Sequence, residues 1–251
     1  MSAEDTVIRL LARPGDHVVH STDVYGGTHK LLSVIKPAEG ITSEAVDLTD
    51  LAEAERVIRA SRPQIVWVET PSNPFLLVTD IAAIAALTHE VGGLLIVDNT
   101  FATPVLQRPL ELGADVVVHS TTKYVGGHSD VIGGAFVLRD GLELPAHVEP
   151  FFGDRDAREA VKLQMALGHV PSPRDTYLAH RGLKTLALRV QRHCENAQKV
   201  ADVPGLPPEG HGRPLSGAAS APATSWRAPR TRPAWEACSP SRSPPRRRRS
   251  S

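Results

Sequence analysis

Three apolar runs of this sequence end in residues that could carry out chemistry. Glu69 closes one run, Asp98 closes the next, and Lys123 lies shortly after a third. Because the carboxyl ends of parallel strands meet at one edge of a sheet, we expect Asp98 and Lys123 to lie at the same edge, although 25 residues separate them in the chain. A lysine amine can act as a nucleophile toward a carbonyl group. The spacing therefore indicates a ligand site at this edge.

Two kinds of cofactor could use such a site. In the first, Asp98 would hold the magnesium ion of a nucleotide. That interpretation requires a G-x-x-x-x-G-K-[ST] loop, which does not occur in the sequence, and the dinucleotide pattern G-x-G-x-x-G does not occur either. In the second, Lys123 would form a Schiff base with the aldehyde of a phosphorylated pyridine cofactor. Ser120 and Thr122 supply hydroxyls for the phosphate, and Tyr25 supplies a ring for stacking. A solvated lysine and an aspartate that caps a strand are the ordinary alternatives.

The elements that must position these residues alternate along the first 200 residues. Strands are predicted at 17–20, 64–69, 94–97, 115–119 and 132–138. Helices are predicted at 26–35, 51–60, 81–90, 158–167 and 176–201, and the last turns of another helix at 7–11. Strands separated by helices indicate βαβ units, so we expect an α/β fold with a mostly parallel sheet.

Composition excludes several classes of protein. Two cysteines are too few for a disulfide-dense secreted scaffold or a four-cysteine zinc site. No apolar run approaches the roughly 18 residues of a membrane-spanning helix. The first residues lack the basic start of a secretory signal. We therefore expect a cytoplasmic protein that does not enter a membrane.

The formal net charge of zero hides an asymmetry between two parts of the chain. Residues 203–251 contain nine arginines, two glutamates and ten of the 21 prolines, which gives this tail a net charge of +7 and residues 1–202 a net charge of −7. The only large aliphatic residues of this tail are Val203, Leu206 and Leu215. They bury too little apolar surface to offset the entropy lost on ordering, and we expect a disordered tail. The tail could bind a polyanion through Arg246–Arg249, or it could be an out-of-frame product without an evolved role. We expect no nucleic-acid partner.

Several short motifs that occur in a fixed order along the chain indicate a particular protein family. They are 23–28 (DVYGGT), 69–74 (ETPSNP), 97–101 (VDNTF), 107–110 (QRPL), 112–115 (LGAD), 119–124 (HSTTKY), 127–130 (GHSD), 171–173 (PSP) and 180–186 (HRGLKTL). Together they resemble the Cys/Met-metabolism (transsulfuration) family of pyridoxal-phosphate enzymes. We place the start of the resemblance at Val7 and its end near Ala201.

The resemblance implies a role for each residue at the predicted edge. Lys123 would bind pyridoxal 5'-phosphate covalently and afterwards move protons between substrate carbons. Asp98 would pair with the pyridine nitrogen and keep it protonated. Ser120 and Thr122 would bond the phosphate. Tyr25 would stack on the ring and act as an acid or base near the substrate.

Two further residues complete the set that the resemblance implies. Asn73 would bond the phenolic oxygen of the cofactor, and Glu69 would be a supporting acid. No metal is implied. The reaction implied is γ-elimination, in which cystathionine yields cysteine, 2-oxobutanoate and ammonia. The alternatives are γ-replacement by cysteine on an activated homoserine ester, and a catalytically dead fragment of either enzyme.

The resemblance also implies a fold and an assembly. Residues 1–202 would form the large, cofactor-binding domain of an aspartate aminotransferase-like (fold type I) enzyme, and residues 203–251 the tail. We expect this domain to be incomplete, because residues 1–6 lack the family's N-terminal arm and phosphate loop. The family forms homo-oligomers with shared active sites, an assembly that loss of the arm would weaken. The partner implied is a small amino-acid substrate.

Overall fold

The computed structural model describes residues 1–145, 148 and 157–202. It contains two compact units, residues 1–187 and 188–251, and each is described by itself. Among the residues that the structure describes, all strands and all the candidate site residues belong to the first unit. The predicted disordered tail, 203–251, lies outside the described residues.

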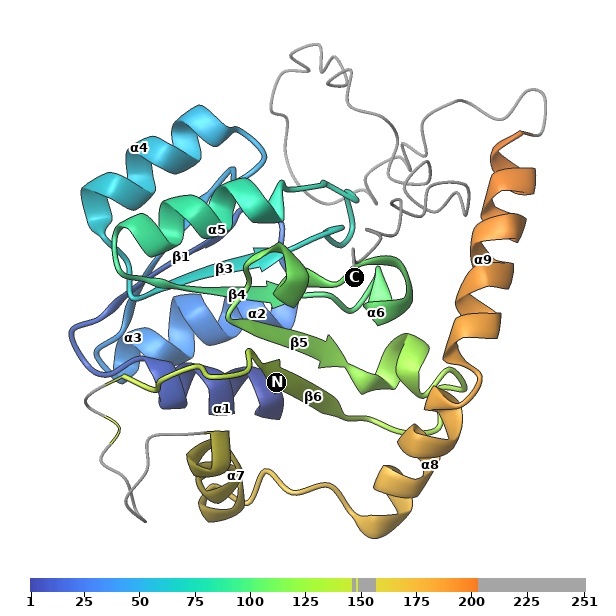
Figure 1. Cartoon of the computed structure of the whole chain (residues 1–251). Coiled ribbons are helices and arrows are strands. Elements are labelled where there is room, and N and C mark those ends of the chain that lie inside the picture. The colour runs from blue at the N-terminus through green and yellow to red at the C-terminus, as the bar shows by residue number, and fades with distance from the viewer. Residues whose placement is uncertain (146–147, 149–156, 203–251) are drawn as a thin grey trace, which may run out of the picture. The chain divides into compact units, whose positions relative to one another are not determined.

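A six-stranded sheet forms the centre of the first unit, with the order β2-β1-β3-β4-β5-β6 (Figure 1). The strands are β1 (His17–Ser21), β2 (Thr42–Val46), β3 (Ile65–Glu69), β4 (Leu94–Asp98), β5 (Val116–Ser120) and β6 (Gly134–Leu138). All neighbours pair in parallel except β5 and β6, which are antiparallel. The predicted α/β fold with a mostly parallel sheet is confirmed. The sequence did not indicate β2, an edge strand whose side chains are mostly exposed.

Helices cover both faces of this sheet (Figure 1). The described helices of the first unit are α1 (Ser2–Leu11), α2 (Gly26–Lys30), α3 (Lys36–Ala38), α4 (Leu51–Ser61), α5 (Ile81–Glu90), α6 (Thr103–Leu106), α7 (Ala157–Ala166) and α8 (Pro173–Leu183). A π-helical segment, Leu31–Ile35, joins α2 to α3. The second unit contributes most of α9 (Leu186–Ala201).

The core explains why β3, β4 and β5 consist of almost uninterrupted apolar residues. Alternate residues of these strands face opposite sides: Trp67 and Ile96 pack with α1, whereas Val68 and Val97 pack with α4 and α5. Because both faces of a parallel sheet are covered, both sets must be apolar. Polar residues are accommodated where the strands end, and this confines the chemistry to the edges of the sheet.

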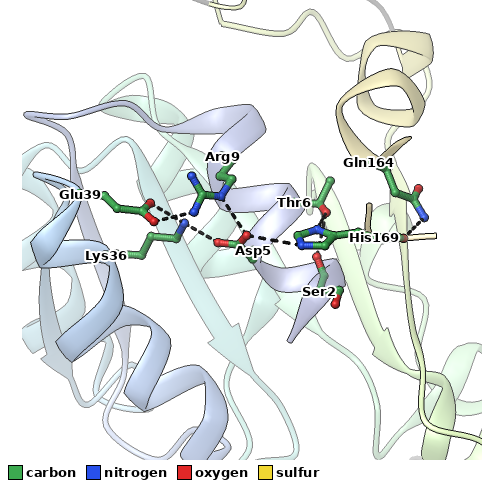
Figure 2. Close-up of polar contacts among 8 residues, drawn as sticks. All are labelled: Ser2, Asp5, Thr6, Arg9, Lys36, Glu39, Gln164 and His169. Atoms are coloured by element: carbon green, nitrogen blue, oxygen red, sulfur yellow. Dashed lines mark hydrogen bonds and ion pairs between the residues drawn. The ribbon is translucent and has the colours of Figure 1, made fainter. Parts of the chain in front are cut away.

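An ionic network around the buried Lys36, which we call the Lys36 network, joins α1 to α3 (Figure 2). The amine of Lys36 is fully buried and donates to Asp5 Oδ1 at 2.5 Å and to Glu39 Oε2 at 2.9 Å. Arg9 donates to the other carboxylate oxygens of the same two residues, at 2.8 and 2.5 Å. Thr6, also on α1, bonds His169 between α7 and α8 at 2.8 Å. These contacts join α1 to two segments that are distant in sequence.

Two predicted helices differ from those observed. The helix predicted at 7–11 begins at Ser2, so residues 2–6 belong to the same element. The single helix predicted at 176–201 consists of α8 and α9. Ser172 caps α8, with Pro173 at its first position, which is why the helix begins earlier than predicted. α8 ends at Leu183, where the backbone N–H and the hydroxyl of Thr185 both donate to the carbonyl of Gly182, each at 3.2 Å. No helix in the described ranges is long and apolar enough to cross a membrane.

Candidate active site

Two carboxyl groups lie side by side at the carboxyl edge of the sheet. Glu69 ends β3 and Asp98 ends β4, and the two residues are partners in the register of these strands. Each is only 7% exposed. Because register partners on adjacent strands point to the same face, the two acids share one buried environment.

Asp98 is held by the residue two positions further along the chain. The backbone N–H of Thr100 donates to Oδ1 of Asp98 at 2.9 Å, and the Thr100 hydroxyl donates to the same oxygen at 2.6 Å. Burial raises the pKa of Asp98 to about 6 although these hydrogen bonds oppose the shift, and the charge of Glu4 raises it further. No described residue donates a hydrogen bond to the second oxygen, Oδ2. Asp98 therefore has a free acceptor and is ionised at neutral pH.

Glu69 connects the two acids to Tyr25. Its Oε2 accepts the backbone N–H of Tyr25 at 2.7 Å. Burial raises the pKa of Glu69 to about 8; the Tyr25 hydrogen bond opposes this shift, and the charges of Asp98 and Asp23 add to it. Glu69 is therefore protonated at neutral pH beside an ionised Asp98.

Tyr25 lies beside the same edge, because its backbone N–H bonds Glu69. Tyr25 precedes α2 and is 47% exposed. A Cβ atom on Gly27 would lie 2.5 Å from Cε1 of Tyr25, so the glycine leaves room for the ring. The DVYGGT motif thus combines an aromatic residue with the small residue that accommodates it.

Lys123 follows β5 on a short π-helical turn, Thr121–Val125, which we call the lysine segment. Lys123 is exposed and has φ −86° and ψ −114°, outside the helical region. The segment is joined to Asp98 through Thr100, because the Ser120 N–H donates to Thr100 Oγ1 at 2.8 Å. The Thr122 hydroxyl accepts the N–H of Gly133 at 2.9 Å and donates to its carbonyl at 3.2 Å. Thr122 therefore holds the loop after the lysine in place.

Asn73 lies in the loop that follows β3 and is exposed. Asp23 ties this loop to the segment that carries Tyr25, because its Oδ2 accepts the Ser72 hydroxyl and, at 3.1 Å, the N–H of Phe75. The structure thus gathers Tyr25, Glu69, Asp98 and the lysine segment around one edge, with the Asn73 loop attached to it.

Two residues that connect parts of this site, Asp23 and Thr100, lie within the motifs, but the sequence alone indicated no role for them. Thr100 joins Asp98 to Ser120, and Asp23 joins the Tyr25 segment to the Asn73 loop. The available signal for Thr100 was its position two residues after a strand-ending aspartate, where a hydroxyl commonly bonds the carboxylate. No comparable signal exists for Asp23, whose partners lie about 50 residues away.

The side chains at this edge have the chemical groups that pyridoxal phosphate requires. The cofactor requires an acid for its ring nitrogen, an amine for its aldehyde and an aromatic face. Asp98 offers a buried carboxylate with one free oxygen, Lys123 an exposed amine, and Tyr25 a half-exposed ring. Ser120 places a hydroxyl next to the lysine segment.

Comparisons with known proteins point to one family. Cystathionine γ-synthase of Mycobacterium leprae is 49% identical over 202 residues, which are 80% of this chain and 48% of that protein. Cystathionine β-lyase of Coxiella burnetii is 45% identical, with 80% and 49% covered. The crystal structure of cystathionine γ-lyase from Lactobacillus plantarum, complexed with L-serine, matches with a TM-score of 0.69 and 44% identity, over 79% of this chain and 49% of that one. The chain thus spans about half the length of the relatives it matches.

A family model described as "Cys/Met metabolism PLP-dependent enzyme" matches residues 1–203. The match begins at residue 1, whereas the motifs alone placed the start at Val7; the motifs missed residues 1–6, which contribute the first turns of α1. The resemblance to pyridoxal-phosphate enzymes is confirmed: the chain belongs to the Cys/Met metabolism family of PLP-dependent enzymes.

Proposed function

We propose that this protein binds pyridoxal phosphate at the carboxyl edge of its sheet and cleaves a carbon–sulfur bond by γ-elimination. In this reaction cystathionine and water yield cysteine, 2-oxobutanoate and ammonia. The observation that carries the proposal is the register pairing of two buried acids, Glu69 and Asp98, beside the segment that presents Lys123. With a pKa of about 6, against about 8 for Glu69, Asp98 is the acid favoured to carry a charge at pH 7. This arrangement supplies one negative charge where a protonated ring nitrogen needs it.

The residues of this chain would divide the work between holding the cofactor and moving protons. Oδ2 of Asp98 would accept a hydrogen bond from the ring N–H and keep that nitrogen protonated. Lys123 would anchor the aldehyde carbon, with Ser120 and Thr122 near the phosphate. Tyr25 would cover one face of the ring, and Asn73 would bond the phenolic oxygen. When bound, pyridoxal phosphate supplies an electron sink for the negative charge that develops at the substrate α-carbon.

Two residues of the chain are suited to proton transfer. The amine of Lys123 is exposed, so once released from the cofactor it can accept a proton at one substrate carbon and return it at another. The phenol of Tyr25 would protonate the departing sulfur, because Tyr25 is bonded to Glu69 at this edge and its side chain is half exposed. Glu69 holds the backbone of Tyr25 rather than the substrate.

A second candidate reaction is γ-replacement, in which cysteine displaces the ester group of an activated homoserine. The specific observation in its favour is the 49% identity to a protein named cystathionine γ-synthase. The two reactions use the same edge and differ in whether a thiol attacks the γ-carbon. A third possibility is a chain that retains the fold without catalysis, and the experiment below separates it from both.

The test begins with the cofactor and then compares the two reactions. The purified chain is mixed with pyridoxal phosphate, reduced with borohydride, and mapped by peptide mass spectrometry. A pyridoxyl group on Lys123 is expected, and Lys123→Ala should remove it while Lys199→Ala, a change at another exposed lysine, should not. Absence of the group from a folded wild-type chain would contradict the proposal. Release of 2-oxobutanoate from cystathionine then indicates elimination, whereas formation of cystathionine from cysteine and a homoserine ester indicates replacement.

A further inference from the structure

One glycine of α8 lies against the backbone that follows Lys123. A Cβ atom built on Gly182 would stand 2.3 Å from the carbonyl oxygen of Gly126 and 2.5 Å from that of Val125. No side chain fits at such distances, and the atoms in the way are backbone atoms that cannot rotate aside. The HRGLKTL motif, to which the proposed reaction gave no role, thus supplies the point at which α8 touches the end of the lysine segment.

Further contacts leave the lysine segment little freedom. The N–H of Gly126 donates to the carbonyl of Thr121 at 2.8 Å, and the N–H of Gly127 donates to the carbonyl of Lys123 at 2.8 Å. At the other end, Thr122 is tied to Gly133. Lys123 sits between these fixed points with a non-helical ψ of −114°.

α8 is itself held firmly at both ends. Ser172 caps its first turn by accepting the N–H of Asp175 at 3.1 Å. At the other end, two donors of Thr185 bond the carbonyl of Gly182. α8 is therefore capped at both ends, and its buried Gly182 lies directly against the backbone that follows Lys123, so a side chain added here would press on the lysine segment.

We propose that Gly182 is a positioning residue that sets the place of Lys123 by allowing α8 to seat directly on the backbone of Val125 and Gly126. This inference rests on the proposed function, in which Lys123 is the cofactor lysine. A methyl group at residue 182 would force the two backbones apart by about 1 Å, the difference between 2.3 Å and an ordinary contact of 3.4 Å. A shift of that size at a reacting group is enough to change rate or affinity on the order of a hundredfold.

The experiment compares two glycines that each lie against a backbone carbonyl oxygen. Gly182→Ala is the test variant, and Gly93→Ala is the control, because a Cβ on Gly93 would lie 2.5 Å from the carbonyl oxygen of Pro63. Gly93 immediately precedes β4, whereas Asp98 ends it, so the control crowds the opposite edge of the sheet. Both variants should melt at a lower temperature than the wild-type chain.

Only Gly182→Ala should alter the lysine segment. Hydrogen exchange of the amides at 121–127 should accelerate at least about tenfold in Gly182→Ala and stay unchanged in Gly93→Ala. The concentration of pyridoxal phosphate that half-saturates Lys123, measured by borohydride trapping, should rise by about tenfold or more in Gly182→Ala alone. Equal exchange at 121–127 and equal trapping in the two variants would overturn the proposal.

The two readouts separate this inference from the proposed function. If the wild-type chain takes up no pyridoxyl group on Lys123, the proposed function fails, and the exchange measurement still decides whether Gly182 holds the segment. If Gly182→Ala does not fold, native-state exchange of the wild-type chain in low denaturant takes its place. The amides of Gly126 and Gly127 should then lose protection together with those of 179–183, and independent loss would overturn the inference.

Discussion

Glu69 and Asp98 face each other across β3 and β4, each 7% exposed, yet they differ in charge at neutral pH. Burial raises the pKa of both, to about 8 for Glu69 and about 6 for Asp98, and the hydrogen bonds from Thr100 oppose the shift of Asp98. Two neighbouring buried acids cannot both ionise without cost, so the one that accepts more hydrogen bonds carries the charge. The sheet register thereby creates a proton donor and an anion in adjacent positions.

The protonated state of Glu69 predicts a particular dependence of stability on pH. In the unfolded chain this carboxyl group ionises near its ordinary pKa of 4.5, whereas in the folded chain it keeps its proton to about pH 8. Between these values the folded state binds more protons, so the contribution of Glu69 to the free energy of unfolding falls as pH rises. Glu69→Gln should flatten the decline of the melting temperature between about pH 4.5 and 8, because the amide does not titrate and its oxygen can still accept the Tyr25 N–H.

The control for this change is Glu111→Gln, at an exposed glutamate that pairs with Arg108. It should leave the slope of melting temperature against pH as in the wild-type chain. An unchanged slope in Glu69→Gln would show that Glu69 is ionised in the folded state.

Asp98 predicts how cofactor affinity depends on pH. Above about pH 6 its carboxylate is ionised and can pair with a protonated ring nitrogen; below that value it is neutral. The affinity of the wild-type chain for pyridoxal phosphate should therefore weaken as pH falls through 6. Asp98→Asn should bind about tenfold or more weakly at pH 7.5 and lack this step, because removing one ion-paired hydrogen bond costs about 1.5–3 kcal/mol.

Fluorescence titrations with pyridoxal phosphate at several pH values measure this difference. Asp140→Asn, at an exposed aspartate, is the control and should titrate as the wild-type chain does. The same pH step in Asp98→Asn as in the wild-type chain would assign the titration to another group.

Thr100→Val tests the residue that links Asp98 to the lysine segment. The change keeps the shape of the side chain but removes a 2.6 Å hydrogen bond to Asp98 and the acceptor for the Ser120 N–H. We expect a loss of about 1–3 kcal/mol in the free energy of unfolding, because partly buried partners are left unsatisfied. The pKa of Asp98 should also rise, since a hydrogen bond that lowers it is gone.

An exposed copy of the same arrangement serves as the control. The N–H and hydroxyl of Thr49 donate to Oδ1 of Asp47 at 3.0 and 2.6 Å, but both residues are exposed. Urea unfolding should show a loss below about 0.5 kcal/mol for Thr49→Val. Equal losses for Thr49→Val and Thr100→Val would mean that Thr100 acts only on its own turn.

Local pattern was sufficient to predict the strands that position the site. The strands before Glu69 and Asp98 are buried on both faces, so their sequences are continuous apolar runs that are easily recognised. β2 gave no such signal, because an edge strand with exposed side chains resembles a loop. The division between α8 and α9 was also hidden, since it depends on hydrogen bonds from Thr185 that do not alter the apolar spacing.

The candidate site followed from residue types at strand ends, but its electrostatics did not. The sequence gives no indication that Glu69 and Asp98 are register partners, since that depends on how two strands align. The close approach of Gly182 to Gly126 depends in the same way on a contact between segments 56 residues apart. Family motifs can point to such residues, whereas only the structure gives the distances that explain them.

Lys36→Met removes the buried positive charge at the centre of the Lys36 network and keeps most of the side-chain volume. Glu39 would then keep Arg9, and Asp5 would keep Arg9 and the more distant ring nitrogen of His169. Burial favours a higher pKa for both acids, but hydrogen bonds from Lys36 and Arg9 bring each below its ordinary value. Without Lys36 the two carboxylates are undercompensated, and the free energy of unfolding should fall by about 3 kcal/mol at pH 7.

The same network predicts how this loss depends on pH. Because the folded pKa of each acid is depressed, their contribution is present above about pH 4.5 and disappears as pH falls through the folded values. Urea unfolding should therefore show Lys36→Met and the wild-type chain converging in acid. Arg56→Met, which breaks an exposed pair with Glu53, should leave the free energy of unfolding almost unchanged, because solvent screens such a pair. A loss for Lys36→Met as small as that for Arg56→Met would mean that α1 is held on the sheet by apolar packing alone.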